Sequence, residues 1–233
     1  MENKKQIKRR KNKYAAPVGG LFIILAVVGL ITVFVQSFHL TNRIMDNSGQ
    51  LQKFENIIKP VIMFDPVPFD NIEDADNNII LQSSLWYVIL NNPEDHFQYS
   101  SNGMILITAS DVDMACAKLY GAGKKIEHQS FGDYDITYYF DKETQTYQVP
   151  SIIQTGFYTP QIVEVLSAKD DIVSLVVAYI PPYDSLTLNV LKDKKEITPD
   201  KYMVYELRKI KDNYFVSAIK YPPEKYSQYN MPN

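Results

Sequence analysis

The sequence has few of the residues that form disulfides and metal sites. One of its 233 residues is cysteine, three are histidine, and no His-Glu-x-x-His or Cys-x-x-Cys spacing occurs. A single cysteine excludes an internal disulfide framework, and scattered histidines do not predict a zinc site. We expect Cys116 to be a buried thiol in a helix, and His39, His96 and His128 to be solvated or capping side chains. The sequence therefore predicts no metal and no other cofactor.

Asp, Glu, Lys and Arg are absent from residues 15–42. Within this stretch, residues 18–35 are mostly apolar, and a helix of that length measures about 27 Å, enough to cross the hydrocarbon core of a bilayer. A secretory signal peptide has a shorter apolar region, of about 7–15 residues, and small residues before its cleavage site. We therefore predict a retained signal anchor, with a transmembrane helix over residues 15–36.

The residues before this run are strongly basic. Residues 1–14 contain seven basic side chains and one acidic, a net charge of +6; because the whole chain carries −3, the rest carries −9. Basic residues stay on the cytoplasmic side of a span, so we expect the C-terminal domain to lie outside the plasma membrane. A nucleic-acid or nuclear-import patch is the alternative, but attraction to anionic headgroups explains the basic residues without another partner.

The charge of the exported part bounds its partners. An acidic surface is repelled by nucleic acid and by anionic wall polymers, which leaves a protein partner, a cation or a neutral glycan; plain solubility explains the same charge more simply. The spacing of Ala15 with Gly19 and of Ala16 with Gly20 allows two spans to approach closely, so a homodimer stays open. We expect the lipid bilayer and a protein of the cell envelope as partners, and no nucleic acid.

Prolines and turn residues divide the rest of the chain. Apolar residues at helical spacing predict a stalk helix over residues 37–59, broken once at Asn47-Ser48-Gly49 and ended by Pro60. Residues 64–69 contain two prolines and predict a stiff connector on the domain surface. The predicted divisions are a basic cytoplasmic tail (1–14), a transmembrane helix (15–36), a juxtamembrane stalk and connector (37–78), an extracytoplasmic α+β domain (79–221) and a C-terminal tail (222–233).

Two helices are predicted early in the extracytoplasmic domain. Helical spacing indicates a helix over residues 79–90, with Asp76 and Asn77 as capping candidates. A second helix follows over residues 110–120, with Ser110 as its cap, Asp113 at the third helical position and Gly121 at its end.

Hairpin signals account for most of the remaining domain. Asn102-Gly103 predicts a tight hairpin between residues 97–99 and 104–108. Three more hairpins are predicted, which join residues 136–140 with 144–149, 162–166 with 172–180, and 203–210 with 214–219. Residues 172–180 are apolar on both faces, which is typical of a central strand covered on both sides. The predicted fold class is α+β, two or three helices packed on one curved antiparallel sheet, in the element order of cystatin-like and nuclear-transport-factor-like folds.

Four segments of the chain carry a resemblance: Pro60 to Phe69, Ala109 to Asp113, Phe131 to Asp135 and Tyr179 to Pro182, which together cover much of the exported domain. In these segments the chain resembles small uncharacterised single-pass membrane proteins of Gram-positive, Clostridia-type bacteria. The resemblance implies no activity.

Two motifs that carry chemistry elsewhere fail here for physical reasons. Ser217 and Lys220 match a Ser-x-x-Lys acyltransferase pattern, but their neighbours predict a strand, in which odd spacing sends the two side chains to opposite faces. Residues 74–78 begin like a calcium-binding loop, but Ile79 stands where glycine is needed and Leu85 where the bidentate Glu belongs. We therefore interpret residues 74–78 as a linker and a helix cap.

Acidic and aromatic residues gather after the second helix. Asp133, Tyr134 and Asp135, with Tyr138 and Tyr147 on the following strands, are the candidate ligand-binding residues. Aromatic rings can stack on sugars and two carboxylates can supply acid and base, so this cluster could bind or cleave a glycan. The alternative is that turns recruit Asp and half-buried strands recruit Tyr for backbone and packing reasons alone.

The sequence identifies no catalytic residue. The prediction is a membrane-anchored extracytoplasmic binding or assembly module of the cell envelope; a cell-wall glycan-binding domain or hydrolase is the alternative, and a conjugation-type scaffold is a third hypothesis.

Overall fold

The computed structural model describes residues 25–29, 48–132, 137–150, 156–182 and 198–227. The chain forms two compact units, Met1–Leu40 and Thr41–Asn233. In the first unit residues 25–29 are helical, and none of the helices described in the chain is long and apolar enough to cross a membrane. Most of the predicted transmembrane helix, the basic tail and residues 37–47 of the predicted stalk lie outside the described residues, so those expectations stay predictions.

The second unit is α+β, with two antiparallel sheets and few helices. Its helices are α2 (Ser48–Ile62), α3 (Asn77–Asn91), α4 (Ala109–Tyr120) and α6 (Glu224–Ser227), with the short 3-10 helices η1 (Ile72–Asp74) and η2 (Glu94–His96). Its strands are β1 (Gln98–Tyr99), β2 (Ile105–Thr108), β3 (Phe131–Gly132), β4 (Thr137–Asp141), β5 (Thr146–Val149), β6 (Thr159–Lys169), β7 (Ile172–Ile180), β8 (Lys201–Ile210) and β9 (Asn213–Lys220).

The four predicted hairpins all form, but the expectation of one sheet is wrong. Strands β6 to β9 form a four-stranded meander, whereas β1 to β5 form a separate sheet in the order β1-β2-β5-β4-β3. In the five-stranded sheet β2 pairs with β5, with Ile107 opposite Tyr147, so the first hairpin joins the second and neither joins the meander. Turn residues specify the two partners within a hairpin, but they carry no information about which hairpins pair with each other.

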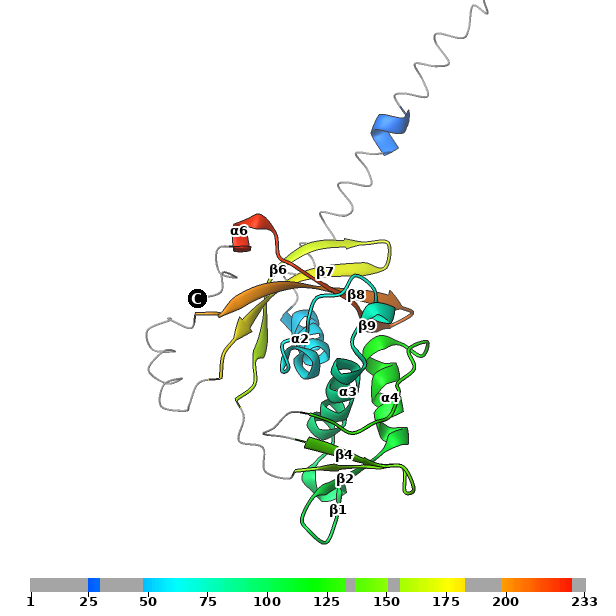
Figure 1. Cartoon of the computed structure of the whole chain (residues 1–233). Coiled ribbons are helices and arrows are strands. Elements are labelled where there is room, and N and C mark those ends of the chain that lie inside the picture. The colour runs from blue at the N-terminus through cyan, green and yellow to red at the C-terminus, as the bar shows by residue number, and fades with distance from the viewer. Residues whose placement is uncertain (1–24, 30–47, 133–136, 151–155, 183–197, 228–233) are drawn as a thin grey trace, which may run out of the picture. The chain divides into compact units, whose positions relative to one another are not determined.

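Helices α3 and α4 lie between the two sheets (Figure 1). They run antiparallel: the Ser83 hydroxyl in the middle of α3 lies 2.6 Å from the Tyr120 hydroxyl at the end of α4, and Tyr87, later in α3, contacts Lys118, earlier in α4. One side of the pair contributes Ile80 and Leu119 to the core under the four-stranded sheet. The other side contributes Leu81, Leu85, Trp86 and Val112 to a second core against the five-stranded sheet, so the helices join the two cores.

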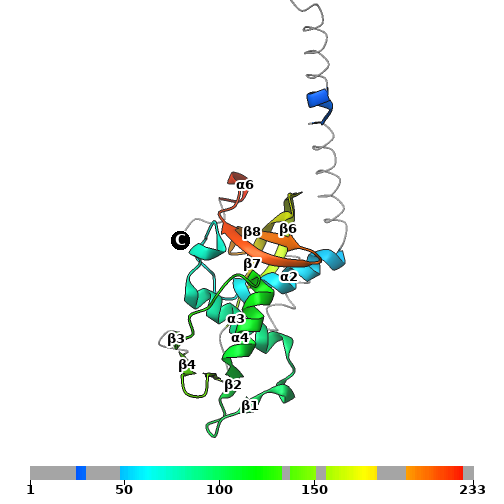
Figure 2. The ribbon, with the colours of Figure 1, turned by 90° about the vertical axis from the view of Figure 1, so that its right-hand side faces the viewer.

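Helix α2 packs under the four-stranded sheet, where the sequence predicted a stalk (Figure 2). Its Phe54, Ile58, Val61 and Ile62 side chains are fully buried. The prediction that Pro60 ends the helix is wrong, because α2 continues to Ile62. A proline inside a helix costs about 3 kcal/mol. Burial of two aliphatic side chains beyond Pro60, each worth about 1.5–3 kcal/mol, offsets that cost.

The helix caps agree with the sequence in two of three cases. The Asp76 carboxylate accepts a hydrogen bond from the Asn78 N–H at 2.7 Å and caps α3, as predicted. Gly121 ends α4 with φ of +91°, also as predicted. The predicted cap Ser110 is wrong: Thr108 caps α4 by accepting from the Asp111 N–H at 3.1 Å. The Thr108 hydroxyl also donates to the Asp111 carboxylate at 2.6 Å. The cap residue and its acidic partner are therefore Thr108 and Asp111, two positions before the predicted pair of Ser110 and Asp113.

The outer face of the four-stranded sheet carries α6 (Figure 1). The Tyr226 hydroxyl donates to Glu164 Oε2 at 3.0 Å, and the Tyr226 ring lies 4.8 Å from that of Tyr202. Tyr202 is opposite Ala178 on β7, and Ala178 is fully buried. The prediction that β7 is a central strand covered on both faces is therefore confirmed, with α6 providing part of the outer cover.

The free edge of β6 is irregular. Pro160 stands near its start, and the pairing with β7 shifts register at two places along the strand. The Ile162 N–H is bonded to Oε1 of Glu55, a residue of α2, at 2.9 Å. At the other edge of this sheet, Phe69 and Ile219 exchange two backbone hydrogen bonds, which extends the sheet past β9.

Candidate functional site

The structure describes only part of the predicted glycan cluster. Asp133, Tyr134 and Asp135 lie outside the described residues. Tyr138 and Tyr147 are 1% and 0% exposed, so their ring faces are not available to a sugar. The Tyr138 hydroxyl accepts a hydrogen bond from the Trp86 ring nitrogen at 3.0 Å, and its ring stacks on Phe131 at 4.8 Å. These two tyrosines therefore pack the second core, and the hypothesis for the three preceding residues stays a prediction.

The two discarded motifs have structural roles. Ser217 lies on β9 and donates to the Glu206 carbonyl at 3.1 Å, while Lys220 binds the Glu206 carboxylate at 2.8 Å, so neither group activates the other. Of residues 74–78, Asp74 ends η1, Asp76 caps α3 as predicted, and the last two residues begin α3. Across the described residues, no group of three or more His, Cys, Asp and Glu side chains could hold a metal ion.

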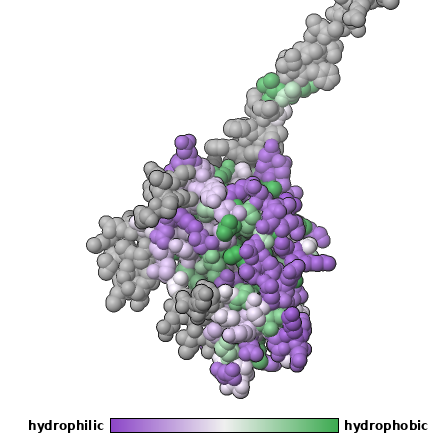
Figure 3. Space-filling model, viewed as in Figure 1, coloured by the Kyte–Doolittle hydropathy of each residue, from purple (hydrophilic) through white to green (hydrophobic). Residues whose placement is uncertain are grey.

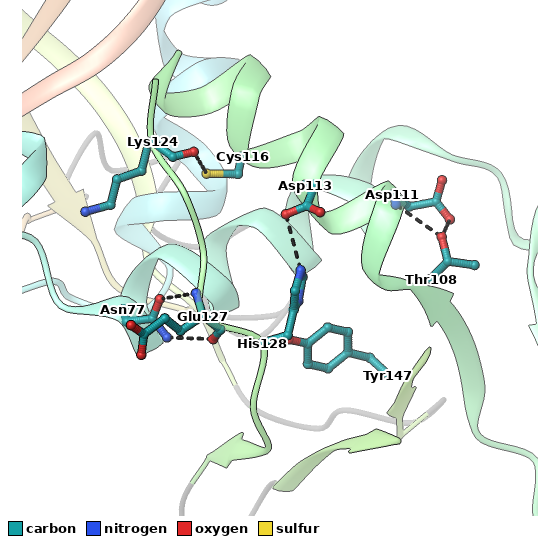
Figure 4. Close-up of polar contacts among 9 residues, drawn as sticks. All are labelled: Asn77, Thr108, Asp111, Asp113, Cys116, Lys124, Glu127, His128 and Tyr147. Carbon is teal, nitrogen blue, oxygen red and sulfur yellow. Dashed lines mark hydrogen bonds and ion pairs between the residues drawn. The ribbon is translucent and has the colours of Figure 1, made fainter. Parts of the chain in front are cut away.

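His128 forms a polar relay that the sequence did not predict (Figure 4). Its Nε2 lies 3.2 Å from Oδ1 of Asp113 on α4, and its Nδ1 lies 2.9 Å from the Tyr147 hydroxyl on β5. The Tyr147 oxygen also accepts the backbone N–H of Gln129. A neutral imidazole therefore fits: Tyr147 donates to Nδ1, and the Nε2 proton is donated to Asp113.

This relay resembles a proton-transfer chain but has no accessible nucleophile. Burial raises the pKa of Tyr147 well above its ordinary value, and its side chain is 0% exposed. The His128 ring is covered by Phe140, which stacks on it at 5.3 Å. The relay ties the segment between α4 and β3 to both α4 and the five-stranded sheet, which is a positioning role.

Further contacts fix the same segment to both helices (Figure 4). The Asn77 side chain at the start of α3 bonds the backbone of Glu127 twice, at 2.9 and 3.0 Å. The Lys124 carbonyl accepts a weak contact from Cys116 Sγ at 3.9 Å. Burial, countered in part by a hydrogen bond with Ser84, raises the pKa of the Cys116 thiol to about 11. The predicted buried thiol is confirmed, and at neutral pH it stays protonated and unreactive.

Two hollows lie along the pair of helices and are the candidate binding site. The first, here called the hairpin hollow, has a volume of about 630 Å³ and lies between α3, α4 and the β1–β2 hairpin. Its lining residues are Tyr87, Val88, Asn91, Asn92, His96, Phe97, Gln98, Leu106, Ile107, Thr108, Asp111, Met114, Ala115, Lys118 and Thr146. Binding sites for small molecules usually measure about 300–1,000 Å³, so this volume is sufficient for a ligand.

The second hollow, here called the turn hollow, has a volume of about 720 Å³. It lies between α2, the same two helices and the turn from β8 to β9. Its lining residues are Gln50, Lys53, Asn56, Ile57, Tyr87, Ala117, Lys118, Asp212, Asn213, Tyr214 and Phe215.

Tyr87 and Lys118 line both hollows. The Lys118 ammonium lies over the Tyr87 ring, 5.9 Å from its centre, and separates one hollow from the other. Lys118 is exposed, so its flexible side chain can swing aside without disturbing the core. The two hollows together are here called the groove, which runs from the β1–β2 hairpin to the β8–β9 turn.

The sequence carried a weak signal for the groove. Asp111, Met114 and Lys118 stand at spacings of three and four, so they share one face of α4, and Tyr87 and Asn91 do so on α3. Met114 is 56% exposed, but a single apolar side chain at the surface is ordinary, so it adds little to this signal. The hollows depend on the approach of the β1–β2 hairpin and the β8–β9 turn, which local patterns do not encode.

Comparison with known protein families, curated proteins and solved structures gives no match. Function therefore has to be argued from the geometry alone. On the face of the second unit seen in Figure 3, hydrophilic residues predominate and hydrophobic residues show in small areas between them. That face offers no large apolar patch, whereas the groove combines apolar, amide and charged side chains.

Proposed function

We propose that the chain is a membrane-anchored, extracytoplasmic binding or assembly module of the cell envelope, and that the groove is its binding surface. The observation that carries this proposal is the pair of hollows that share Tyr87 and Lys118. The basic tail and the uncharged stretch over residues 15–42 support the single-pass anchor with a cytoplasmic N-terminus. A homodimer through that span stays an alternative arrangement of the same module.

The proposed fold of the second unit is cystatin-like in one part. Helix α2 packed on the four-stranded meander β6–β9 supports that comparison, while the five-stranded sheet is an addition to it. The proposed relationship to uncharacterised Gram-positive single-pass proteins is based on the sequence of residues 60–69, 109–113, 131–135 and 179–182.

Binding is favoured over hydrolysis. Glycosidases use two carboxyl groups about 5–10 Å apart on either side of the scissile bond. Asp111 is the carboxylate that lines the hairpin hollow and Asp212 is the one that lines the turn hollow, so each hollow has one. Asp111 is in addition bonded to the Thr108 hydroxyl at 2.6 Å as part of the helix cap. A catalytic function is therefore not proposed for the groove.

The experiment uses the full chain with Met114 replaced by cysteine (Met114→Cys), because Met114 is exposed and lines the hairpin hollow. Cys116 is 1% exposed and its pKa is raised to about 11, so the chain without the substitution should not react with the maleimide. Val67→Cys is the matched control, because Val67 is 77% exposed and lines neither hollow. A membrane-impermeant maleimide is added to intact cells that express each variant, and to the purified protein.

We expect both thiols to react in intact cells, because both lie outside the membrane in this proposal. In cells the Met114→Cys thiol should react more slowly than in the purified protein, while the Val67→Cys rate stays the same. Labelling of either thiol only after the cells are permeabilised would refute the extracytoplasmic location. Equal slowing of both thiols would refute the groove as the binding surface.

A further inference from the structure

The groove has a lining that is rich in uncharged polar groups. Amide and hydroxyl side chains occur along its whole length: Gln50, Asn56, Asn91, Asn92, Gln98, Thr108, Thr146 and Asn213. An amide group both donates and accepts hydrogen bonds, as a sugar hydroxyl does, so the two can be paired in either sense. Such a lining satisfies a ligand with many hydroxyl groups without requiring it to carry charge.

Two of these amides are held in place by the helix that carries them. The Asn91 side chain donates to the Tyr87 carbonyl and the Asn92 side chain donates to the Val88 carbonyl, each at 2.8 Å. The end of α3 is thereby fixed together with the side chains that line the hairpin hollow. A fixed polar group loses less conformational entropy on binding than a mobile one.

Aromatic side chains are distributed along the groove. Phe97 lines the hairpin hollow, Tyr214 and Phe215 line the turn hollow, and Tyr87 lines both. Tyr87, Phe97, Tyr214 and Phe215 are each half-buried, in contrast to the fully buried tyrosines of the cores. A partly exposed ring offers an apolar surface next to polar groups, which suits the apolar face of a sugar ring.

The charges of the groove cancel. Lys53 and Lys118 are its Lys and Arg cations, and Asp111 and Asp212 are its carboxylates. Neither an anionic nor a cationic polymer gains a net attraction from such a lining. The negative balance of the chain beyond residue 14 adds repulsion of anionic polymers. A neutral ligand pays no such electrostatic cost.

We propose that the groove binds a neutral glycan chain, with sugar units in both hollows and the Tyr87–Lys118 pair between them. This inference rests on the proposed binding function and names its ligand class. A chain long enough to occupy both hollows gains contacts in each of them, while a short oligomer gains those of one.

The test is a calorimetric titration of the purified full chain with β-1,4-linked N-acetylglucosamine oligomers as neutral probes. We expect the hexamer to bind at least about tenfold more tightly than the dimer, because 1.4 kcal/mol of added contact is a factor of ten. Asn56→Ala in the turn hollow and Gln98→Ala in the hairpin hollow should each weaken hexamer binding about three- to tenfold, the worth of one hydrogen bond. Both residues are exposed, so these variants should fold.

Tyr87→Ala should weaken hexamer binding more than either amide variant, because it removes the ring shared by both hollows. Tyr221→Ala is the matched control: Tyr221 is 75% exposed and lines neither hollow, so hexamer affinity should not change. Equal affinities for dimer and hexamer, or a hexamer affinity that is unchanged in both amide variants, would overturn the proposal.

The two proposals fail in different ways. Slowed labelling at Met114→Cys in cells without any oligosaccharide binding would overturn the glycan ligand and leave the binding module. If an extended polypeptide bound to the groove while the hexamer did not, the glycan ligand would be overturned as well. Hexamer binding without slowed labelling in cells would support the glycan ligand and refute the proposed role in the envelope.

Discussion

The Tyr179 and Tyr205 hydroxyls form a buried pair whose energetics can be tested directly. Both side chains are fully buried, on the adjacent strands β7 and β8, and their oxygens are 2.8 Å apart. Tyr179→Phe or Tyr205→Phe removes one hydroxyl and keeps both rings, so the edge contact of Tyr179 with Tyr158 at 5.3 Å is preserved. The hydroxyl that remains then lies in an apolar core without its partner.

The expected magnitudes follow from that geometry. A buried hydroxyl that loses its partner costs about 1–3 kcal/mol of unfolding free energy, so each single variant should lose that amount. Replacement of both partners by apolar groups of the same shape is nearly neutral. The double variant should therefore lose less than either single variant, so the coupling energy between the sites exceeds either single loss and reaches about 2–6 kcal/mol, the sum of the two, if the double variant is neutral.

The assay is urea unfolding of the purified chain, followed by the fluorescence of Trp86, the single tryptophan, which is 7% exposed. Tyr221→Phe is the control for loss of an exposed hydroxyl and should change stability by less than about 0.5 kcal/mol. Additive losses in the double variant would show that the two hydroxyls do not depend on each other, and would refute the reasoning.

Three further predictions concern alkaline pH, α4 and the relay. Burial raises the pKa of Tyr226 to about 12, so the folded state keeps a proton that the unfolded chain releases near pH 10. The free energy of unfolding, measured by urea titration, should therefore keep its full Tyr226 contribution below about pH 10 and fall between pH 10 and 12. Gly121→Ala should destabilise by about 1–3 kcal/mol, because φ of +91° is strained for alanine while the added methyl would only touch Phe215 at 3.9 Å. His128→Leu should cost about 1–3 kcal/mol in the same assay, because the buried Tyr147 hydroxyl loses its acceptor.

Each of these predictions has a contradicting result. Stability that is level from pH 9 to pH 12 would contradict the alkaline loss. An unchanged Gly121→Ala variant would show that α4 ends in another conformation. His128→Leu is compared with His96→Leu, because His96 is exposed and the structure gives it no side-chain hydrogen bond among the described residues. If both variants lost the same small amount of unfolding free energy, the result would show that the relay has no structural role.

Local features of the fold were predictable because local chemistry decides them. Asn102-Gly103 marks a hairpin in which Gly103 has φ of +75°. Asp76 caps α3 by accepting a hydrogen bond from the Asn78 N–H, two residues along the chain. The strand from Ile172 to Ile180 was predicted at its observed bounds, since an apolar run on both faces is buried on both.

Features that depend on distant segments were not predictable. The sequence around Pro60 predicts the end of a helix, and the structure continues α2 because Val61 and Ile62 of its last turn are buried in one core with strands a hundred or more residues later. His128 looks like a loop residue until α4 and β5 bring Asp113 and Tyr147 to its two nitrogens. The groove was missed for the same reason, because its lining comes from four separate parts of the chain, residues 50–57, 87–118, 146 and 212–215.

The contact between Glu55 and the outer strand of the meander bears on how copies of the protein meet. Backbone donors on one side of a strand recur at every second residue, so positions 160 and 162 face the same way. Pro160 has no N–H, and the Ile162 N–H is already bonded to Glu55. A neighbouring chain that approached this border would find no donor at either position, which disfavours strand-to-strand joining of two copies at this end of β6.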